Sequence, residues 1–371
     1  MIFFVRSYSI DTDSRLQKYL QLCSISNIKY RVLGWNKDIK EEDTDVIKYY
    51  NGDFKLGKQW LNLLAIFKWW FFVFRKLIKN RNQITHVHSV DLDCGIVCFV
   101  FCTLFRKKHI YDVYDVYTEN RNIKGRMKAV INTIEKKICL SSYAYIMPEK
   151  FRLAQLSIDE NKSKRFLEIE NVPFIKNVDC QLQEDRGASN HIKLVYAGSL
   201  EPVHRGIENL LRAVSEDKRF FLDIAGIGPL SQLCKEYSQE YSNIFFHGQL
   251  QPTEVYQLEA SSDVIIGLYY KSRDNHLFAS PNKYYEHLAF GKPMLTTEKT
   301  PPGDKVLSAN TGYAIGDEPE DIETWMESVA YNPDFADKGR NAKKLWDEKY
   351  DFYFDSYFRN AYLKILGEHN V

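Results

Sequence analysis

Residues 192–226, IKLVYAGSLEPVHRGIENLLRAVSEDKRFFLDIAG, decide the fold. An apolar run of strand length (192–197) precedes a stretch with the apolar spacing of a helix (206–216), and a second apolar run (219–225) follows. A strand, a helix and a strand in this order are typical of parallel strands joined by a crossover helix. The same alternation fills most of the remaining chain and predicts an α/β protein.

Length and a change of rhythm indicate two domains. A chain of 371 residues is long for one compact domain. Strand-like and helix-like stretches alternate over residues 1–175, stop in the polar stretch 176–191, and then begin again. The sequence therefore predicts a first domain over 1–175 and a second over 190–350, each built on a doubly wound parallel sheet.

Composition excludes several classes of protein. The net charge is +1 with 27% charged residues, so no overall positive field favours nucleic acid. The seven cysteines form no CxxC pair, and Cys94, Cys98 and Cys102 recur at every fourth position, which places them on one helix face. We expect these three to be small core residues rather than metal ligands, in a reducing cytoplasm.

The relation to membranes stays open at this stage. The first residues, MIFFVRSYS, hold too short an apolar run for a signal peptide, and no stretch reaches the roughly 18 apolar residues of a membrane span. Residues 60–80, WLNLLAIFKWWFFVFRKLIKN, crowd aromatic side chains among lysines and an arginine. Such a helix either lies at a lipid headgroup surface or packs in the core while its cations reach solvent.

The second half carries unusual residues just after its predicted strands, where ligands of open parallel sheets bind. In the first loop, Ser199 and Arg205 precede a helix, and a guanidinium beside a helix start is suited to phosphate. Gly226 and Gly228 follow the next strand and allow close approach of a ligand. Leu250 follows the third strand, in a loop that presents backbone groups to a base edge.

The fourth loop is SPNKYYEHLAFGKP, residues 280–293. Ser280 or Asn282 is placed to cap a helix that Gly291 ends. Lys283 lies in the first turn, where the helix macrodipole disfavours a cation, and a bound diphosphate would remove that cost. Glu286, one turn later, is placed to accept hydrogen bonds from ribose hydroxyls. The alternative is an ordinary exposed lysine and glutamate.

These motifs resemble a known family. The order GSLEPVHRGIENLL, AGIGPL, FHGQL and SPNKYYEHLAFGKP is similar to the donor domain of bacterial glycosyltransferase family 4. In the first half, HVHSVDLD and IYDVYDVYTEN resemble the acceptor domain of its polysaccharide-assembly members. The resemblance implies the GT-B fold, in which two Rossmann-like domains face a cleft. It also implies that residues 351–371 form a helix returning to the first domain.

The resemblance also implies roles for individual residues. The donor-binding set is Ser199, Arg205, Gly226, Gly228, Leu250, Ser280, Asn282, Lys283 and Glu286. The catalytic set is Tyr114, Asp115, Arg205 and Lys283, with Asp112 a further candidate base. The acceptor-binding set is Arg15, His88, Asp91 and Glu119. Neither a metal nor a cofactor is implied, because cations offset the charge of the leaving diphosphate.

The chain departs from the family pattern at three positions. Phe278 stands where many members have an earlier glutamate, Ser199 where many have a basic residue, and Tyr114 where many have a histidine. A tyrosine still donates a hydrogen bond, so the change at that position is compatible with an active enzyme. The identity of a catalytic base stays open.

The predicted function is that of a retaining glycosyltransferase. It would move a sugar from a UDP-sugar, or a GDP-sugar, to a lipid-linked oligosaccharide in the synthesis of lipopolysaccharide, O-antigen or capsule. The expected location is the cytoplasm, with peripheral attachment to the inner membrane through residues 60–80. Two alternatives remain: a nucleotide-sugar epimerase of the same fold, and a non-catalytic module that binds sugar nucleotides or membrane.

Overall fold

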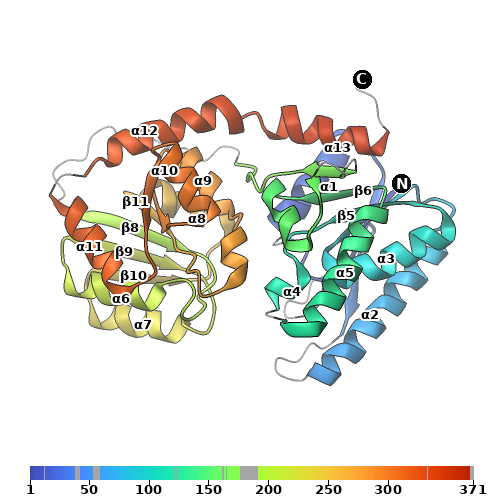
Figure 1. Cartoon of the computed structure of the whole chain (residues 1–371), viewed down its shortest axis with the longest axis horizontal. Coiled ribbons are helices and arrows are strands. Elements are labelled where there is room, and N and C mark those ends of the chain that lie inside the picture. The colour runs from blue at the N-terminus through green and yellow to red at the C-terminus, as the bar shows by residue number, and fades with distance from the viewer. Residues whose placement is uncertain are drawn as a thin grey trace. The chain divides into compact units, whose positions relative to one another are not determined.

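The structure, a computed structural model, groups the chain into two units. It describes residues 1–11, 13–37, 42–52, 59–121, 123–160, 163, 165–175, 191–331 and 333–367. Unit 1 comprises Met1–Glu170 and Asp355–Val371, and unit 2 comprises Asn171–Phe354 (Figure 1). The chain therefore passes from one unit to the other twice.

Unit 1 is built on a parallel sheet whose described strands follow the order β3-β2-β1-β4-β5-β6-β7. The strands are β1 (Ile2–Arg6), β2 (Tyr30–Asn36), β3 (Ile47–Asn51), β4 (His86–Val90), β5 (Lys108–Asp112), β6 (Ala144–Met147) and β7 (Phe166–Glu168). The helices are α1 (Ser14–Ile25), α2 (Gln59–Lys79), α3 (Asp91–Phe105), α4 (Tyr117–Asn120), α5 (Gly125–Ser141), η1 (Lys150–Leu156) and α13 (Arg359–Leu366).

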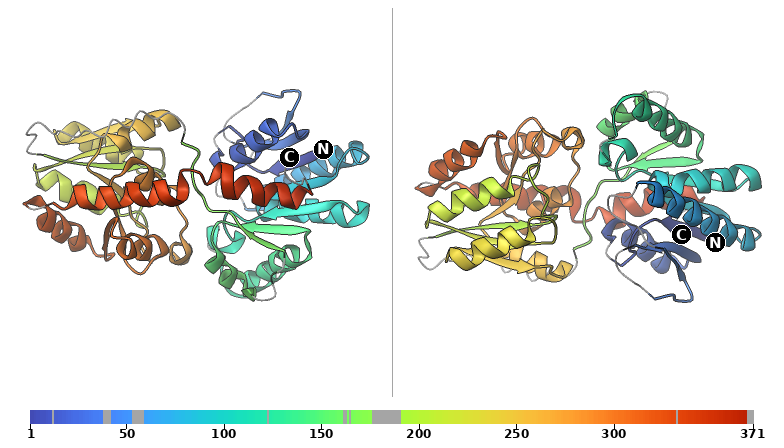
Figure 2. Two further views of the ribbon diagram at one scale, coloured as in Figure 1. Left: turned by 90° about the horizontal axis from the view of Figure 1, so that it is seen from above. Right: turned by 90° about the horizontal axis from the view of Figure 1, so that it is seen from below.

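The two faces of this sheet have different coverings. On β4, Val87 packs into a core shared with α2 and α3, which includes the predicted cysteines Cys94, Cys98 and Cys102. The next side chain along the strand, His88, points to the opposite face. There it contacts Tyr19 of α1 and Tyr362 of α13. The terminal helix α13 therefore completes the core of unit 1 beside α1 (Figure 2).

Unit 2 repeats the architecture with a sheet in the order β10-β9-β8-β11-β12-β13. The strands are β8 (Ile192–Ala197), β9 (Phe220–Ala225), β10 (Ile244–Gly248), β11 (Val264–Gly267), β12 (Met294–Thr297) and β13 (Gly312–Ile315). The helices are α6 (Ile207–Glu216), α7 (Ser231–Glu240), α8 (Pro252–Ala260), η3 (Asp274–Phe278), α9 (Asn282–Phe290), α10 (Pro301–Ser308), α11 (Pro319–Ala330), α12 (Phe335–Leu345) and η4 (Trp346–Tyr350). A last short segment, η5 (Phe354–Phe358), leads into α13.

Alternating side chains of β8 separate the two cores of unit 2. Leu194 and Tyr196 face the core that includes residues of α6 and α11. Val195 points the other way and packs with Phe290 of α9, against side chains of α8. The helices α8 and α9 therefore lie together on one face of the sheet, which brings their polar residues into contact.

The predicted α/β class, with two parallel sheets, is confirmed. Three elements are additional to those expected: β3, β13 and α10. The C-terminal residues form η4, η5 and α13 in succession rather than one continuous helix. Most of the predicted linker 176–191 lies outside the described residues.

Candidate functional site

In unit 2, the strand order places β8 at the centre of the sheet, with β9 on one side and β11 on the other. The connections leaving β8 and β11 run in opposite directions, and a crevice forms at such a switch point. The loop after β8 carries Arg205, and the chain after β11 leads to Ser280 and α9. The sequence-predicted donor residues therefore come from loops at the same end of one sheet.

Close packing of these loops depends on glycine. Gly226, which follows β9, has a φ of 146° and donates a hydrogen bond from its backbone N–H to Gly248 O at 2.7 Å. A Cβ at Gly226 would lie 1.9 Å from Gly198 O, so any other residue would push the loops after β8 and β9 apart. Gly226 therefore shapes the wall of the site rather than supplying a side chain.

Arg205 is the cation at this point whose charge has no carboxylate partner among the described residues. Its guanidinium carbon lies 5.0 Å from the centre of the Tyr269 ring, just after β11. Its Nε atom is buried and has no hydrogen-bond partner within the described chain. A partly buried guanidinium with an unused donor is suited to an anionic ligand.

The start of α9 provides donors beside the switch point. The residue before the helix is Pro281, and no side chain caps the helix through a hydrogen bond. The Ser280 hydroxyl is buried and has no hydrogen-bond partner in the described part of the chain. Its carbonyl oxygen accepts a hydrogen bond from Asn171 Nδ2 at 2.8 Å. A helix start without a side-chain cap favours an anion.

Lys283 differs from the expectation of a lysine that awaits an external anion. Its Nζ atom donates to Glu259 Oε1 at 2.6 Å, and Glu286 Oε2 lies 3.7 Å away. The side chain of Glu259 is 0% exposed, against 11% for Lys283 and 12% for Glu286. An internal carboxylate therefore offsets the cost of a cation in the first turn of α9.

Glu259, on α8, was not among the predicted site residues. The sequence contains one signal for it, because Glu259 lies three positions after Tyr256 and therefore on the same face of α8. That face packs against the sheet of unit 2. Burial, and then the charge of Glu259, raise the pKa of the Glu286 carboxyl well above its usual range.

The remaining predicted donor residues have less specific surroundings. The Ser199 hydroxyl lies 3.4 Å from Glu201 Oε1, and Arg273 pairs with the other Glu201 oxygen at 2.6 Å. Leu250, after β10, is half-buried. Asn282 is the first residue of α9, and the backbone of Gly228 accepts a hydrogen bond from Ser231 Oγ at 2.8 Å.

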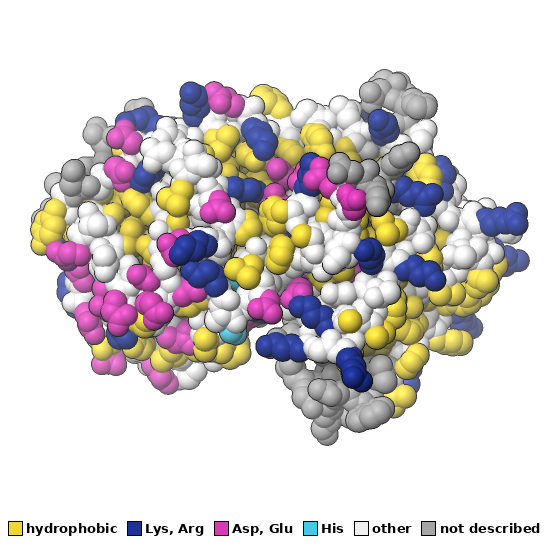
Figure 3. Space-filling view, in the orientation of Figure 1, with side chains coloured by type: hydrophobic (Ala, Val, Ile, Leu, Met, Phe, Trp, Pro, Cys, Tyr) yellow, Lys and Arg dark blue, Asp and Glu magenta, His cyan; other side chains and the backbone are white. Residues whose placement is uncertain are grey.

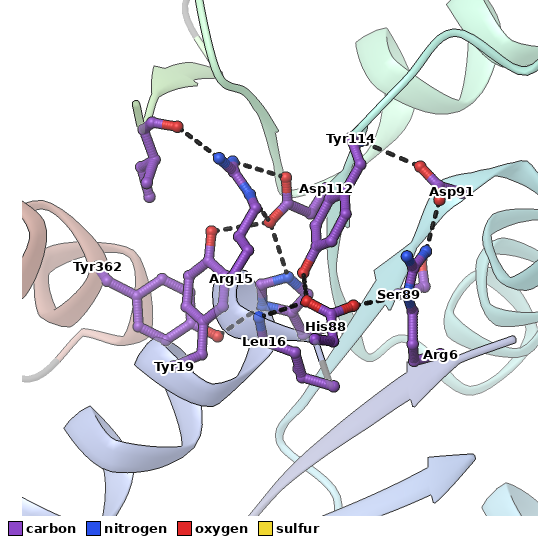
Figure 4. A network of polar contacts seen from close by, with 12 residues as sticks. Arg6, Arg15, Leu16, Tyr19, His88, Ser89, Asp91, Asp112, Tyr114 and Tyr362 are labelled. Atoms are coloured by element: carbon purple, nitrogen blue, oxygen red, sulfur yellow. Dashed lines mark hydrogen bonds and ion pairs between the residues drawn. The ribbon is translucent and has the colours of Figure 1, made fainter. Parts of the chain in front are cut away.

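Unit 1 has a second polar cluster at its own switch point, between β1 and β4 (Figure 4). Arg6, at the end of β1, lies 2.8 Å from Asp13 and 2.5 Å from Asp91. Asp91 starts α3 with a φ of 57°, and its second oxygen accepts the Tyr114 backbone N–H at 3.0 Å. The Tyr114 hydroxyl donates to Asp13 at 3.2 Å. Sequence reasoning missed Arg6 and Asp13.

A buried ion pair lies beside this cluster. Arg15 contacts both oxygens of Asp112, at 2.9 and 3.2 Å, and also donates to Ile169 O at 2.6 Å. Burial alone would raise the pKa of Asp112, but the charge of Arg15 outweighs it and lowers that pKa to about 2. Tyr19 donates to the same carboxylate at 2.7 Å. Arg15 is therefore held by internal partners.

Three predicted first-half residues are likewise engaged within unit 1. His88 is 0% exposed and lies 2.7 Å from the Tyr362 hydroxyl through Nδ1. Asp115 pairs with Arg152 at 2.7 Å, and Glu119 pairs with Lys128 at 2.8 Å. The structure brings Tyr114, Asp115 and Asp91 to one loop region, where the backbone N–H of Asp115 also approaches Asp91 at 3.5 Å.

Solved structures share this architecture over nearly the whole chain. HepE from Anabaena, in complex with UDP-glucose, is 12% identical and matches with a TM-score of 0.69 over 98% of this chain and 99% of its own. WaaG, a glycosyltransferase involved in lipopolysaccharide biosynthesis, is 13% identical, with a TM-score of 0.65 over 97% and 99%. The fold is GT-B. A UDP-N-acetylglucosamine 2-epimerase also matches, at 12% identity and a TM-score of 0.62 over 100% and 97%.

The GT-B fold alone does not separate a transferase from an epimerase. Residues 191–331, which contain all strands of the unit 2 sheet, match the family model described as glycosyl transferases group 1. No curated protein matches the sequence. The domain match supports a transferase, as the sequence predicts.

Proposed function

We propose that this protein transfers a sugar from a nucleotide diphosphate sugar, with a UDP-sugar favoured over a GDP-sugar. The proposal rests on the unpaired Arg205 guanidinium at the switch point of unit 2. HepE, which has the same fold, is known in complex with UDP-glucose, and this supports a uridine nucleotide.

The diphosphate would bind between Arg205 and the start of α9. The Arg205 Nε donor and the Ser280 hydroxyl are both unused within the described chain, and a diphosphate offers acceptors for both. Glu286, one turn into α9, would accept hydrogen bonds from the ribose hydroxyls. Gly226 and Gly228 would leave room for the nucleotide.

Transfer would proceed with retention at the anomeric carbon. The bond from the sugar to the diphosphate breaks, and negative charge grows on the departing phosphate oxygen. Arg205 would stabilise that charge more strongly as it develops, which lowers the barrier. The leaving oxygen would take the proton of the acceptor hydroxyl. We place acceptor recognition at the Tyr114, Asp115 and Asp91 loop region of unit 1.

A lipid-linked acceptor is supported by the surface of α2. Leu64, Phe67 and Phe71 are 59%, 54% and 68% exposed, although Trp69 of the same helix is fully buried. The exposed cations Lys68 and Arg75 flank these side chains. We call Leu64, Phe67, Lys68, Phe71 and Arg75 the α2 patch.

The charge around the α2 patch is one-sided. Residues 59–79 contain no aspartate or glutamate. Part of the patch, with Tyr50 and Phe72, borders an open depression of about 440 Å³. Figure 3 shows hydrophobic and basic side chains gathered on the part of unit 1 where Figure 1 places α2. Exposed aromatics among cations suit the headgroup layer of an anionic membrane.

No helix among the described residues combines the length and the hydropathy that crossing a bilayer requires. The proposed attachment is therefore peripheral, at the inner membrane, where lipid-linked intermediates of surface polysaccharides are found. WaaG, which acts in lipopolysaccharide biosynthesis, shares the fold and supports this setting.

The donor proposal is tested by a thermal-shift panel of UDP, GDP, ADP and their sugars. A ligand that binds only the folded state raises the melting temperature. We expect a shift with UDP or UDP-glucose. The absence of a shift with every nucleotide in the panel would reject the donor site.

Glu286→Ala should weaken UDP binding by about 2 kcal/mol, because two hydrogen bonds to ribose are lost. Isothermal titration calorimetry measures this change. Glu236→Gln, on the exposed surface of α7, is the control and should bind UDP as the parent does. Equal affinity of Glu286→Ala and the parent would remove Glu286 from the nucleotide site.

The double variant Phe67→Ser with Phe71→Ser should reduce sedimentation with vesicles that contain an anionic phospholipid. Both side chains are exposed, so the fold is retained. Leu307→Ser, 56% exposed on α10 of unit 2, is the matched control. Sedimentation that is unchanged by the double variant, or equal on purely zwitterionic vesicles, would contradict the proposed attachment.

An epimerase remains the second candidate, because an epimerase shares the fold. The two activities differ in their need for an acceptor. An epimerase converts UDP-N-acetylglucosamine without any acceptor, whereas a transferase leaves the sugar configuration of its donor unchanged. Nuclear magnetic resonance of the nucleotide sugar after incubation distinguishes them.

A further inference from the structure

The Glu259, Lys283 and Glu286 side chains form a group of two carboxyls around one ammonium, which we call the α8–α9 triad. Glu259 Oε1 lies 2.6 Å from Lys283 Nζ, and Glu286 Oε2 lies 3.7 Å from it. Glu259 is fully buried, and its other oxygen has no hydrogen-bond partner among the described residues. Lys283 is therefore the one described group that compensates the Glu259 charge.

One ammonium cannot fully compensate two buried carboxylates. Lys283 is closer to Glu259, which lies deeper, so Glu259 is the carboxyl that stays ionised in this geometry. Ionising Glu286 as well would place a second negative charge in the same poorly solvated space. Its pKa of about 8, raised by burial and then by Glu259, agrees with this arrangement.

We propose that Glu259 is a positioning residue that holds Lys283 inward and keeps Glu286 protonated until a nucleotide binds. The inference rests on the proposed nucleotide site. When ribose hydroxyls donate to Glu286, the carboxylate form is favoured, and the proton leaves Glu286 for solvent. Nucleotide binding is therefore coupled to the release of a proton.

The groups that face Glu286 come from three elements. Glu259 and Tyr256 lie on α8, Tyr269 follows β11, and Lys283 lies on α9 itself. Burial raises the pKa of both tyrosines, so they stay neutral near pH 7. Arg205 lies beyond Tyr269 and stays charged. The Glu286 carboxyl is the group of this set that titrates near neutrality.

Two histidines of unit 2 do not contribute to the expected effect. Burial lowers the pKa of His276 and of His287 to about 4, so both are neutral in the range of interest. In unit 1, burial lowers the pKa of Lys18 to about 7. A comparison between the parent and a Glu259 variant removes the effect of Lys18, which is unchanged.

The experiment measures the affinity for UDP-glucose by calorimetry between pH 6 and about 8.5. The diphosphate of this probe is a diester and does not titrate in that range. For the parent, we expect the affinity to fall about tenfold for each pH unit below the pKa of Glu286. We also expect close to one proton released at pH 6.5, measured in buffers of different ionisation enthalpy.

Glu259→Gln removes the charge that keeps Glu286 protonated, so Glu286 is ionised at lower pH. We expect a flatter pH dependence and fewer protons released in this variant. Glu286→Gln should abolish both effects, and Glu236→Gln, exposed on α7, should match the parent. A purely structural role for Glu259 would lower the melting temperature and leave the pH dependence as it is.

A parent-like pH dependence in a Glu259→Gln variant that binds UDP-glucose overturns the inference. If this variant does not fold, Glu259→Asp serves instead, because its charge is retained and its pH dependence must follow the parent. A parent protein that binds no UDP-glucose at any pH rejects the uridine-nucleotide site rather than the role of Glu259.

Discussion

Arg205→Ala lowers kcat/KM for sugar transfer by about 100- to 1000-fold, the effect of losing one charged donor at a developing negative charge. The loss should fall mainly on kcat, since the guanidinium acts most strongly when the phosphate oxygen departs. The side chain has no described ion pair, and its buried Nε has no hydrogen-bond partner there. Its removal therefore leaves no other group without a partner.

Arg212→Ala is the matched control. Arg212 lies on α6, next to Arg205 in the sequence, and its exposed guanidinium pairs with Glu323 at 3.0 Å. Exposed pairs contribute little, so this variant should keep the parent rate and melting temperature. A steady-state assay with radiolabelled UDP-glucose compares the two variants. Equal kcat/KM for Arg205→Ala and Arg212→Ala would exclude Arg205 from the donor site.

Asp112→Ala destabilises the protein by about 3 to 5 kcal/mol, because it leaves the buried Arg15 charge without its partner. The Arg15 and Asp112 side chains are 6% and 0% exposed, so water does not replace the lost contacts. Tyr19 loses its acceptor at the same time. Urea denaturation followed by circular dichroism measures the change as a lower midpoint.

Two further variants separate this charge effect from simple loss of volume. Asp115→Ala removes a carboxylate that is 38% exposed and should cost less than about 1 kcal/mol. The double variant Arg15→Met with Asp112→Leu removes both charges and should recover much of the lost stability. A double variant as unstable as Asp112→Ala would show that the pair matters for packing and not for charge compensation.

The pattern of apolar runs was sufficient to predict the fold, except at the sheet edges. β3 and β13 are edge strands, and most of their side chains are only partly buried. Edge strands therefore lack the continuous apolar run that predicts a buried strand. α10 starts with Pro301, Pro302 and Gly303, residues that suggest a turn, although Thr300 caps it by accepting the Gly303 N–H.

The donor loops were predictable because position after a strand is a property of the sequence. The partners of their side chains were not, since pairing across helices depends on the packed structure. Lys283 shows the difference: its unfavourable place in the first turn was visible in the sequence, but Glu259 lies 24 residues away on another helix. Similarly, the predicted acceptor residue Arg15 is held by Asp112, 97 residues later.

The double passage of the chain between the units has a consequence for how each unit is made. Unit 2 is a single uninterrupted segment, whereas unit 1 needs both ends of the polypeptide. On a ribosome, the hydroxyl of Tyr362 that meets His88 is synthesised last. Unit 1 therefore waits with an open seam beside Tyr19 until the donor half has been made. A premature stop anywhere before α13 would leave that seam unfilled.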